Sequence, residues 1–226
     1  MGFDRRPALD RRPGLDRRSA VIAVLDYGIG NLRSAEKALQ HLGADAELIA
    51  DPERAAGAVG IVLPGVGAFG RCAEALRGSG LDQVALSAIE RGVPFLGICV
   101  GFQLLYEGSD EDPSASGLGI LAGKVRRLPP GVKHPQMQWN QLLPVTGDTF
   151  APGLLAGVEP SAWVYFLHSF APERTADTSS ICDYGGPVTA SAERERVWGT
   201  QFHPEKSGSV GLGILANFVR TVEGNR

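Results

Sequence analysis

The chain is poor in the features that mark secreted, membrane-spanning and metal-dependent proteins. It has only three cysteines, widely spaced and without a C-x-x-C pair, so neither a disulfide framework nor a zinc site is predicted. No apolar run approaches the roughly 18 residues that a membrane-spanning helix needs. We therefore expect a protein of the reducing cytoplasm, with no membrane association, no metal and no cofactor.

The chain also lacks a strong excess of one charge. Its formal net charge is −3, which predicts no binding to nucleic acid or to a membrane surface and leaves a small molecule as the expected substrate. With 226 residues, 43% of them hydrophobic, the chain can bury one sizeable core.

The first residues differ from the rest in composition. A hexapeptide repeat begins at Asp4, Asp10 and Asp16, and it combines six arginines with three aspartates. Proline in each full repeat and the low apolar content predict a disordered Arg-rich extension over residues 1–19. A weak anion-binding arm is the alternative. The folded domain is expected over residues 20–226.

From residue 21 onward, buried strand patterns alternate with helical ones, which is typical of a parallel sheet covered on both faces. The predicted strands are 21–25, 46–50, 60–63 and 93–98, and the predicted helices are 31–42, 81–91 and 211–221. After residue 124, short strands separated by Pro/Gly turns indicate an antiparallel portion, at 125–128, 138–143, 164–167, 187–191 and 195–202. The fold class is therefore α/β, a single three-layer domain with a mostly parallel central sheet, helices on both faces and an antiparallel C-terminal portion.

One cysteine lies where a strand pattern turns sharply into a helical pattern. Cys99 is the centre of the sequence G-I-C-V-G at residues 97–101. Glycines on both sides of a nucleophile leave room for so tight a turn, as in the G-x-S-x-G nucleophile elbow. The pattern predicts a reactive Cys99 that projects into solvent. From this pentapeptide alone, a small cysteine buried in the core is an equal alternative.

A candidate base lies far along the chain, where the strand pattern 195–202 runs into His203, Pro204 and Glu205. Proline ends the strand and leaves the histidine and the glutamate at its exposed end. In a catalytic relay the imidazole takes the thiol proton, and the carboxylate orients the imidazole. Alone, such a tripeptide is more often a solvated turn. Together with Cys99 it predicts a cysteine–histidine–carboxylate triad.

Two glycine-rich loops follow strand patterns. Residues 27–31 lack the third glycine of G-x-G-x-x-G and a Walker lysine, so we expect a tight turn there. Residues 64–70 offer several backbone N–H groups with little side-chain cover. Those of Gly65, Val66 and Gly67, with the N–H of Val100, would hold the negative oxygen of a tetrahedral intermediate. An ordinary strand-to-helix turn is the alternative.

Taken together, these segments resemble the class I glutamine amidotransferases, in which a cysteine elbow precedes a distant H-x-E. More narrowly, the chain is similar to the glutaminase subunits of imidazole glycerol phosphate synthases. The elbow and H-P-E are shared by the whole class. The segments that favour this particular group of glutaminase subunits are P-G-V-G, Y-F-x-H-S and K-S-G. The resemblance covers residues 21–220, and its matching segments are 26–34, 63–67, 97–105, 165–169 and 201–208.

The resemblance implies hydrolysis of L-glutamine to glutamate and ammonia through a thioester on Cys99. His203 would act as base and then as acid, with Glu205 as its orienter. The loop 65–67 would complete the oxyanion hole after a peptide rearrangement triggered by a partner. By motif matching, the glutamine would be held by Gln103, Glu111, His168, Ser169 and Phe170. From the residues alone, Gln103 is also explained as a polar residue one turn into a helix, and His168 as a core histidine.

The partner implied by the resemblance is the cyclase of imidazole glycerol phosphate synthase, which is a (β/α)8 barrel and forms a heterodimer with the glutaminase. It would receive ammonia through an internal channel and form imidazole glycerol phosphate and aminoimidazole carboxamide ribotide in histidine biosynthesis. Five residues match segments that face the cyclase: Met137, Gln138, Trp139, Asn140 and Lys206. The family pattern P-H-M-G-W-N is here P-Q-M-Q-W-N, so we expect the side chain at 138 to alter the docking surface.

Three functions remain open on the sequence. They are the histidine-pathway glutaminase, another class I amidotransferase or stand-alone cysteine hydrolase, and a regulatory module without catalysis. The intact Cys99, His203 and Glu205 count against the third. A fused synthetase domain does not fit into 226 residues, which counts against one form of the second.

Overall fold

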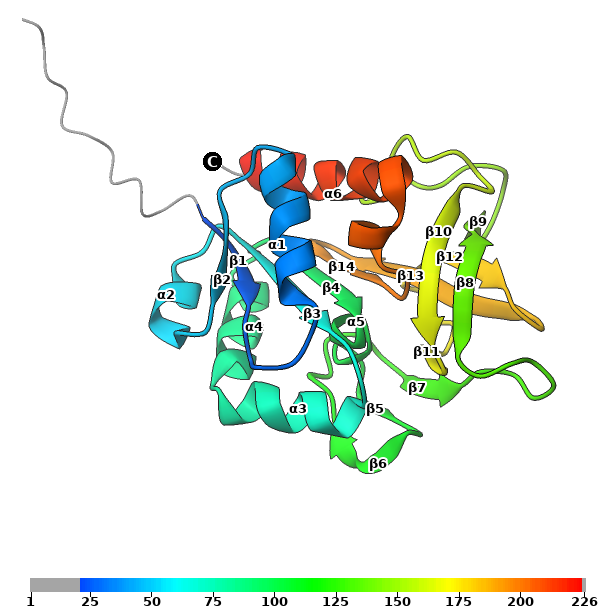
Figure 1. Ribbon diagram of the computed structural model, residues 1–226, viewed down its shortest axis with the longest axis horizontal. Coiled ribbons are helices and arrows are strands. Elements are labelled where there is room, and N and C mark those ends of the chain that lie inside the picture. Colours follow the sequence, from blue (N-terminus) through cyan, green and yellow to red (C-terminus); the bar gives the residue numbers. More distant parts are fainter. Residues whose placement is uncertain (1–20, 225–226) are drawn as a thin grey trace, which may run out of the picture.

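A computed structural model describes residues 21–224 (Figure 1). The predicted extension over residues 1–19 lies outside this range, and the predicted domain boundary at residue 20 stays a prediction. The first half alternates strands and helices, as the hydrophobic periodicity predicts. Its elements are β1 (Ile22–Leu25), α1 (Leu32–His41), β2 (Ala46–Ile49), α2 (Pro52–Ala56), β3 (Gly60–Gly65), α3 (Phe69–Gly78), α4 (Leu81–Glu90), β4 (Phe95–Cys99) and the short α5 (Val100–Gln103).

The second half is mostly strands, which confirms the predicted change of character after residue 124. Its strands are β5 (Gly108–Ser109), β6 (Asp112–Ser116), β7 (Lys124–Arg127), β8 (Gln136–Gln141), β9 (Leu143–Pro144), β10 (Trp163–His168), β11 (Phe170–Pro172), β12 (Thr178–Asp183), β13 (Pro187–Arg194) and β14 (Val197–Thr200). A 3-10 turn, η2 (Pro204–Lys206), and the last helix, α6 (Gly208–Glu223), follow.

Local sequence explains the helix ends near the sheet. Helix α1 buries Leu32, Ala35 and Leu39, which recur at helical spacing. Gly43 follows the helix with φ +85°, a conformation that suits glycine after a helix C-terminus. Asp51 caps the N-terminus of α2, and its carboxylate accepts a hydrogen bond from the Glu53 N–H at 2.9 Å.

The central sheet is mixed, with strand order β2-β1-β3-β4-β14-β13-β12-β9. Strands β2, β1, β3, β4 and β14 are parallel to one another, and β13, β12 and β9 extend the sheet from β14 in antiparallel fashion. Helices α1 and α6 cover one face of the parallel part, while α3 and α4 cover the other (Figure 1). The predicted α/β fold class is therefore confirmed.

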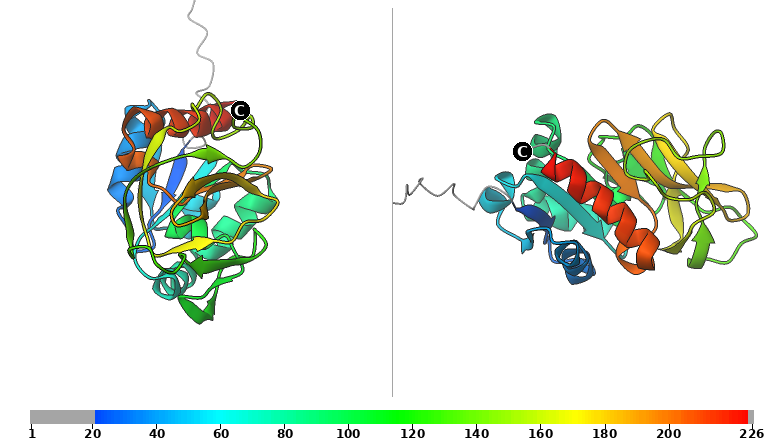
Figure 2. Two further views of the ribbon diagram at one scale, coloured as in Figure 1. Left: turned by 90° about the vertical axis from the view of Figure 1, so that its right-hand side faces the viewer. Right: turned by 90° about the horizontal axis from the view of Figure 1, so that it is seen from above.

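Residues 21–224 also form two smaller sheets. One is the antiparallel pair β10-β8, and the other has the order β11-β7-β5-β6. Figure 2 shows that the yellow and orange antiparallel strands gather at the end of the molecule away from β1 and β2. Within residues 21–224, no helix is long and apolar enough to cross a membrane.

Helices α2 and α3 and strands β5, β6, β11 and β12 are absent from the sequence prediction. Helix α3 begins at Phe69, inside the segment predicted as a glycine loop, and it contains two glycines that weaken its helical pattern. Burial explains why it forms, because Phe69, Cys72, Ala73 and Leu76 all pack into the core. Tertiary packing therefore decides this element rather than local propensity.

The parallel strands bring the chemical motifs to one edge of the sheet. Strands β3 and β4 pair in register up to Gly65 opposite Cys99, and β14 pairs with β4 up to Thr200 opposite Ile98. The glycine loop, the cysteine turn and the His203 segment thus all leave the sheet at the same edge. Ligand sites in open α/β sheets lie beyond these carboxyl ends.

Candidate active site

Cys99 has the strained backbone of a nucleophile elbow. Its φ and ψ are 55° and −111°, in a region that non-glycine residues rarely adopt. The flanking glycines make this turn possible. A Cβ on Gly97 would lie 2.8 Å from the Gly101 carbonyl oxygen, and one on Gly101 would overlap the Leu63 carbonyl oxygen. The structure therefore favours the elbow over the core-filler interpretation.

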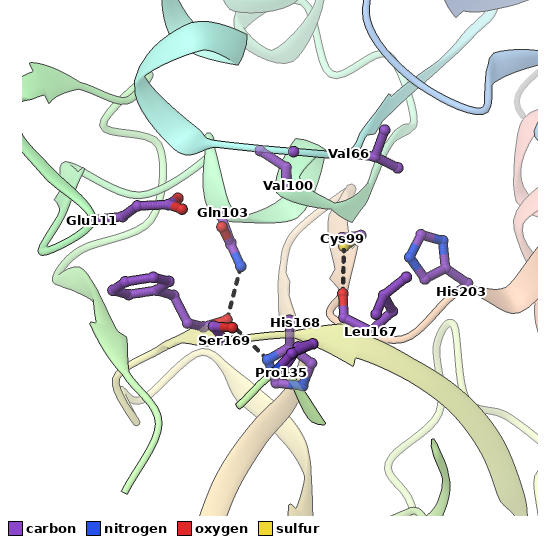
Figure 3. Close-up of a pocket in the computed structure, with 12 residues that line it drawn as sticks. Val66, Cys99, Val100, Gln103, Glu111, Pro135, Leu167, His168, Ser169 and His203 are labelled. Atoms are coloured by element: carbon purple, nitrogen blue, oxygen red, sulfur yellow. Dashed lines mark hydrogen bonds between the residues drawn. The ribbon is translucent and has the colours of Figure 1, made fainter. Parts of the chain in front are cut away.

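His203 follows β14 and holds its ring next to Glu205 on the turn η2. The ring Nδ1 lies 2.8 Å from the Glu205 Oε1, and both side chains are 3% exposed. A carboxylate accepting from Nδ1–H leaves Nε2 as the nitrogen available to other groups. Cys99 and His203 line the same pocket (Figure 3). The three predicted triad residues are thus brought together.

The expected exposure of these residues is wrong. Cys99 is 3% and His203 2% exposed, instead of projecting into solvent or sitting at an exposed strand end. Strand β10 is the cause, because it crosses over the strand ends. The Leu167 carbonyl oxygen lies 3.8 Å from the Cys99 sulfur, and the Tyr165 carbonyl accepts the His203 N–H at 2.9 Å. The nucleophile therefore opens into a pocket rather than into bulk water.

The surroundings of His203 favour its charged form. Burial lowers the pKa of His203, but hydrogen bonds to Cys99 and Glu205 and the negative charges of those groups outweigh it. The net effect raises the pKa well above the ordinary value of about 6.5. At neutral pH the imidazolium is thus favoured beside the sulfur, an arrangement that supports a thiolate nucleophile.

The predicted oxyanion loop runs alongside the elbow. Val66, Gly67 and Val100 line the pocket, while Gly65 is buried at the end of β3 opposite Cys99. Gly67 has φ +94°, which favours glycine. The Tyr27 hydroxyl donates to the Pro64 carbonyl at 2.7 Å, and the Cys72 thiol donates to the Val66 carbonyl at 3.4 Å. These two contacts hold the Pro64 and Val66 carbonyls in this conformation of the loop.

The residues predicted to hold glutamine all line this pocket, and the side chains of Gln103 and Glu111 are hydrogen-bonded to other parts of the protein. The Gln103 amide nitrogen donates to the Phe170 carbonyl at 2.9 Å and to the Gln201 Oε1 at 3.0 Å. Glu111 Oε2 accepts the Phe69 N–H at 2.8 Å, at the start of α3. The five residues found on the pocket wall are Gln103, Glu111, His168, Ser169 and Phe170.

His168 is both a buried core histidine and a residue of the pocket wall, so it fits both interpretations made from the sequence. It is 6% exposed and contributes to the pocket wall. Burial lowers its pKa to about 4, the Phe170 carbonyl opposes this change, and the charge of His203 adds to it. The ring is therefore neutral near pH 7. Its Nδ1 lies 2.9 Å from the Phe170 carbonyl oxygen, which leaves Nε2 as an acceptor without a hydrogen-bond partner among residues 21–224.

Two buried residues next to the triad were missed from the sequence. The Gln201 Nε2 lies 3.7 Å from the Cys99 sulfur, and the Ser207 hydroxyl donates to the His203 carbonyl at 2.6 Å while accepting the Tyr165 N–H at 3.0 Å. Both lie within the segment Q-F-H-P-E-K-S. Their position two and four residues from His203 was the available signal, but a strand pattern does not reveal which side chain reaches the cysteine.

Two of the predicted partner residues, Met137 and Trp139, lie on an exposed face of the β8–β10 pair. Met137 and Trp139 are 59% and 46% exposed, and Trp163, which was not predicted, is 54% exposed. Gln138 and Lys206 are also exposed. Asn140 is partly buried, and its amide donates to the Asp183 carbonyl at 2.9 Å. We call Met137, Trp139 and Trp163 the apolar ribbon face.

The matches to known proteins agree with this geometry. The family model of class I glutamine amidotransferases matches residues 23–222. The chain belongs to this family. The match spans the elbow, the glycine loop and the H-P-E segment, so it covers every residue of the triad.

Curated relatives indicate the group within this family to which the chain is similar. The chain is 45% identical over 203 residues to the imidazole glycerol phosphate synthase subunit HisH of Methanothermobacter thermautotrophicus, covering 89% of this chain and 99% of the relative. It is 46% identical over 212 residues to the HisH subunit of Rhodospirillum rubrum, covering 88% and 98%. Among the class I amidotransferases, this chain therefore belongs with the HisH subunits, as the sequence motifs predict.

Solved structures support the amidotransferase fold. A crystal structure of a glutamine amidotransferase superposes with a TM-score of 0.70 at 19% identity, covering 90% of this chain and 99% of the other. A glutamine amidotransferase from Thermotoga maritima gives a TM-score of 0.59 at 14% identity, covering 92% and 85%. At these identities the likeness concerns the fold alone.

Proposed function

We propose that this HisH-type amidotransferase hydrolyses L-glutamine to glutamate and ammonia and delivers the ammonia to a cyclase subunit. The cyclase, a (β/α)8 barrel, would use it to form imidazole glycerol phosphate and aminoimidazole carboxamide ribotide in histidine biosynthesis. The observation that carries the proposal is that Cys99 and His203 line one pocket, with Glu205 held against the His203 ring, in a chain of the HisH group.

The chemistry follows from the geometry of this set. The Cys99 thiolate, with its proton held on His203, attacks the carboxamide carbon of glutamine, and the carbonyl π electrons move onto oxygen. As that oxyanion collapses, the C–N bond breaks and the His203 imidazolium protonates the leaving nitrogen, which departs as ammonia. Water, deprotonated by His203, then attacks the glutamyl thioester. The C–S bond breaks, and glutamate and the Cys99 thiolate are released.

Electrostatic stabilisation of the oxyanion is expected from the loop 65–67 and the N–H of Val100. Each oxyanion donor is worth roughly 3 kcal/mol in such sites. In our proposal, a peptide rearrangement triggered by the partner completes this hole. Basal glutaminase activity is therefore weak, and the cyclase with its ribotide bound raises it strongly.

The apolar ribbon face is the proposed docking surface for the cyclase. Contiguous exposed apolar side chains on a soluble protein mark interaction sites. Behind this face, β10 also supplies the carbonyl groups of Leu167 and Tyr165 that contact Cys99 and His203. Pressure on β10 from a bound partner therefore reaches the Cys99 sulfur and the His203 backbone through single hydrogen bonds.

The experiment measures glutaminase turnover of the chain alone and with the cyclase and its ribotide. We expect strong stimulation in the wild type, and Trp139→Ala is expected to raise the cyclase concentration needed for half-stimulation about 30-fold, the effect of a typical interface hot spot. Lys37→Ala, an exposed change on α1, is the matched control. High basal turnover that no cyclase alters would instead support a stand-alone hydrolase.

A further inference from the structure

The orientations of two buried amides are fixed by a chain of hydrogen bonds that ends at the nucleophile. The Phe170 carbonyl can only accept, so the Gln103 group at 2.9 Å from it is the NH₂. That NH₂ also lies 3.0 Å from Gln201, which therefore presents its Oε1 to it. The NH₂ of Gln201 is left to face the Cys99 sulfur at 3.7 Å. The donor-to-acceptor direction of these hydrogen bonds is thus set by the Phe170 backbone carbonyl and not by a choice of amide rotamer.

We propose that Gln201 is a catalytic residue whose amide N–H donates to the Cys99 sulfur and stabilises its thiolate, with Gln103 as the residue that orients it. Both amides are buried, Gln201 at 0% and Gln103 at 3% exposure, so no solvent competes for the donor. A hydrogen bond to the charged form of a group favours that form, and it does so more strongly away from water. The proposal deepens the function given above and rests on it, since it concerns the nucleophile of the same reaction.

The other groups that face the thiol show why a neutral donor matters there. Tyr27, just after β1, and Cys72, on α3, interact electrostatically with Cys99, and burial raises the pKa of both, so neither is charged at neutral pH. From β10, the Leu167 carbonyl favours the protonated thiol because it can only accept. His203 supplies the positive charge from the end of β14. Gln201 adds a donor that stays in place when His203 gives its proton away.

This point distinguishes the role of Gln201 from that of His203. During turnover, the imidazolium loses its proton to the leaving nitrogen, while the amide cannot titrate. We therefore expect Gln201 to lower the barrier at both thiolate steps, the attack on glutamine and the departure of the thiolate from the thioester. A residue that only packed α5 against β14 would leave the titration of Cys99 unchanged.

The test is the pH dependence of Cys99 alkylation by iodoacetamide in the full chain, followed by mass spectrometry of the peptide that contains Cys99. The unbranched side chain in Gln201→Met keeps the length but has no donor. We expect its thiolate midpoint to lie about one pH unit higher than in the wild type, so that alkylation below both midpoints is about ten-fold slower. With glutamine as substrate, kcat should fall and KM should stay close to the wild-type value.

Thr200→Val is the matched control. Thr200 is the buried residue just before Gln201, and its hydroxyl has no hydrogen-bond partner within the part of the chain that the structure describes. Successive side chains of an extended strand point to opposite faces, so Thr200→Val leaves the face that carries the Gln201 side chain unchanged. We expect its midpoint to equal that of the wild type.

Gln103→Met provides a second variant. It keeps Gln201 but removes the partner that orients it, so a smaller upward shift of the midpoint is expected. If Gln201→Met does not fold, the thiolate midpoint of Cys99 in Gln103→Met tests the proposal instead.

Wild-type midpoints in both Gln201→Met and Gln103→Met, or an equal shift in Thr200→Val, would overturn the proposal. The alkylation assay reads Cys99 without glutamine. Shifted midpoints in a chain that does not hydrolyse glutamine would therefore refute the proposed function and leave the role of Gln201 intact.

Discussion

Replacing Glu205 with glutamine removes one charge from the triad while keeping the shape of the side chain. In the wild type the Glu205 Oε1 accepts from the His203 Nδ1 at 2.8 Å, and neither side chain is more than 3% exposed. The second carboxylate oxygen, Oε2, is buried without a hydrogen-bond partner among the described residues. The new amide NH₂ of Glu205→Gln would thus face either the imidazole N–H or a site where these residues offer no acceptor.

The size of the effect follows from this contact. A buried hydrogen bond to a charged group contributes about 1.5–3 kcal/mol. If the transition state loses that stabilisation, kcat falls roughly 10- to 150-fold, at 1.36 kcal/mol for each factor of ten. The same loss lowers the pKa of His203 in the variant, since the Glu205 contact is one of the interactions that raise it.

The assay is steady-state glutamate release in the presence of saturating cyclase and its ribotide, measured from acid to alkaline pH. We expect a lower kcat in Glu205→Gln and an alkaline limb displaced to lower pH, because His203 loses its proton earlier. Glu53→Gln, an exposed change on α2, makes the same chemical substitution away from the site. A kcat for Glu205→Gln within two-fold of the wild type would refute the role of the carboxylate.

The same pair predicts a pH dependence of stability. A histidine whose pKa is raised on folding stabilises the protein fully below its unfolded value of about 6.5, and this contribution disappears as pH rises through the folded pKa. The Tm difference between wild type and Glu205→Gln should therefore be widest below pH 6.5 and should narrow toward alkaline pH. A Tm difference that widens with rising pH would contradict the upward shift of the His203 pKa. Two further predictions concern the elbow. Cys99→Ala should bind glutamine, measured by calorimetry, yet form no glutamyl thioester, and turnover near the wild-type level would remove Cys99 from the mechanism. Gly101→Ala should lower the free energy of unfolding by about 3 kcal/mol or prevent folding, because its Cβ overlaps the Leu63 carbonyl. In α6, a Cβ on Gly213 meets no described atom within 4 Å, so Gly213→Ala should be neutral or slightly stabilising when urea titrations give the free energy of unfolding of both variants.

Much of the fold follows from the sequence because its signals are local. Continuous apolar runs separated by helical patterns predict the parallel strands and their edge, and that edge brings Cys99, His203 and the glycine loop together. The turn itself is predicted by Gly97 and Gly101, since no other residue type fits their backbone contacts.

Burial of the triad could not be predicted in the same way. It depends on β10 crossing over the strand ends, and this crossing is a tertiary contact between segments far apart in the chain. The exposed Trp163 was missed for a related reason, because the strand prediction began one residue later. Gln201 looks like any residue at the end of a buried strand until the direction of its side chain is known.

The proposed transfer of ammonia from glutamine on this chain to a cyclase can be followed with an isotope. Its most direct test is to supply amide-¹⁵N glutamine to the chain mixed with the cyclase and its ribotide, and to analyse the imidazole glycerol phosphate by mass spectrometry. We predict ¹⁵N in the product with the wild type and none with Cys99→Ala. Imidazole glycerol phosphate without ¹⁵N, formed while the wild-type chain is active, would contradict the account.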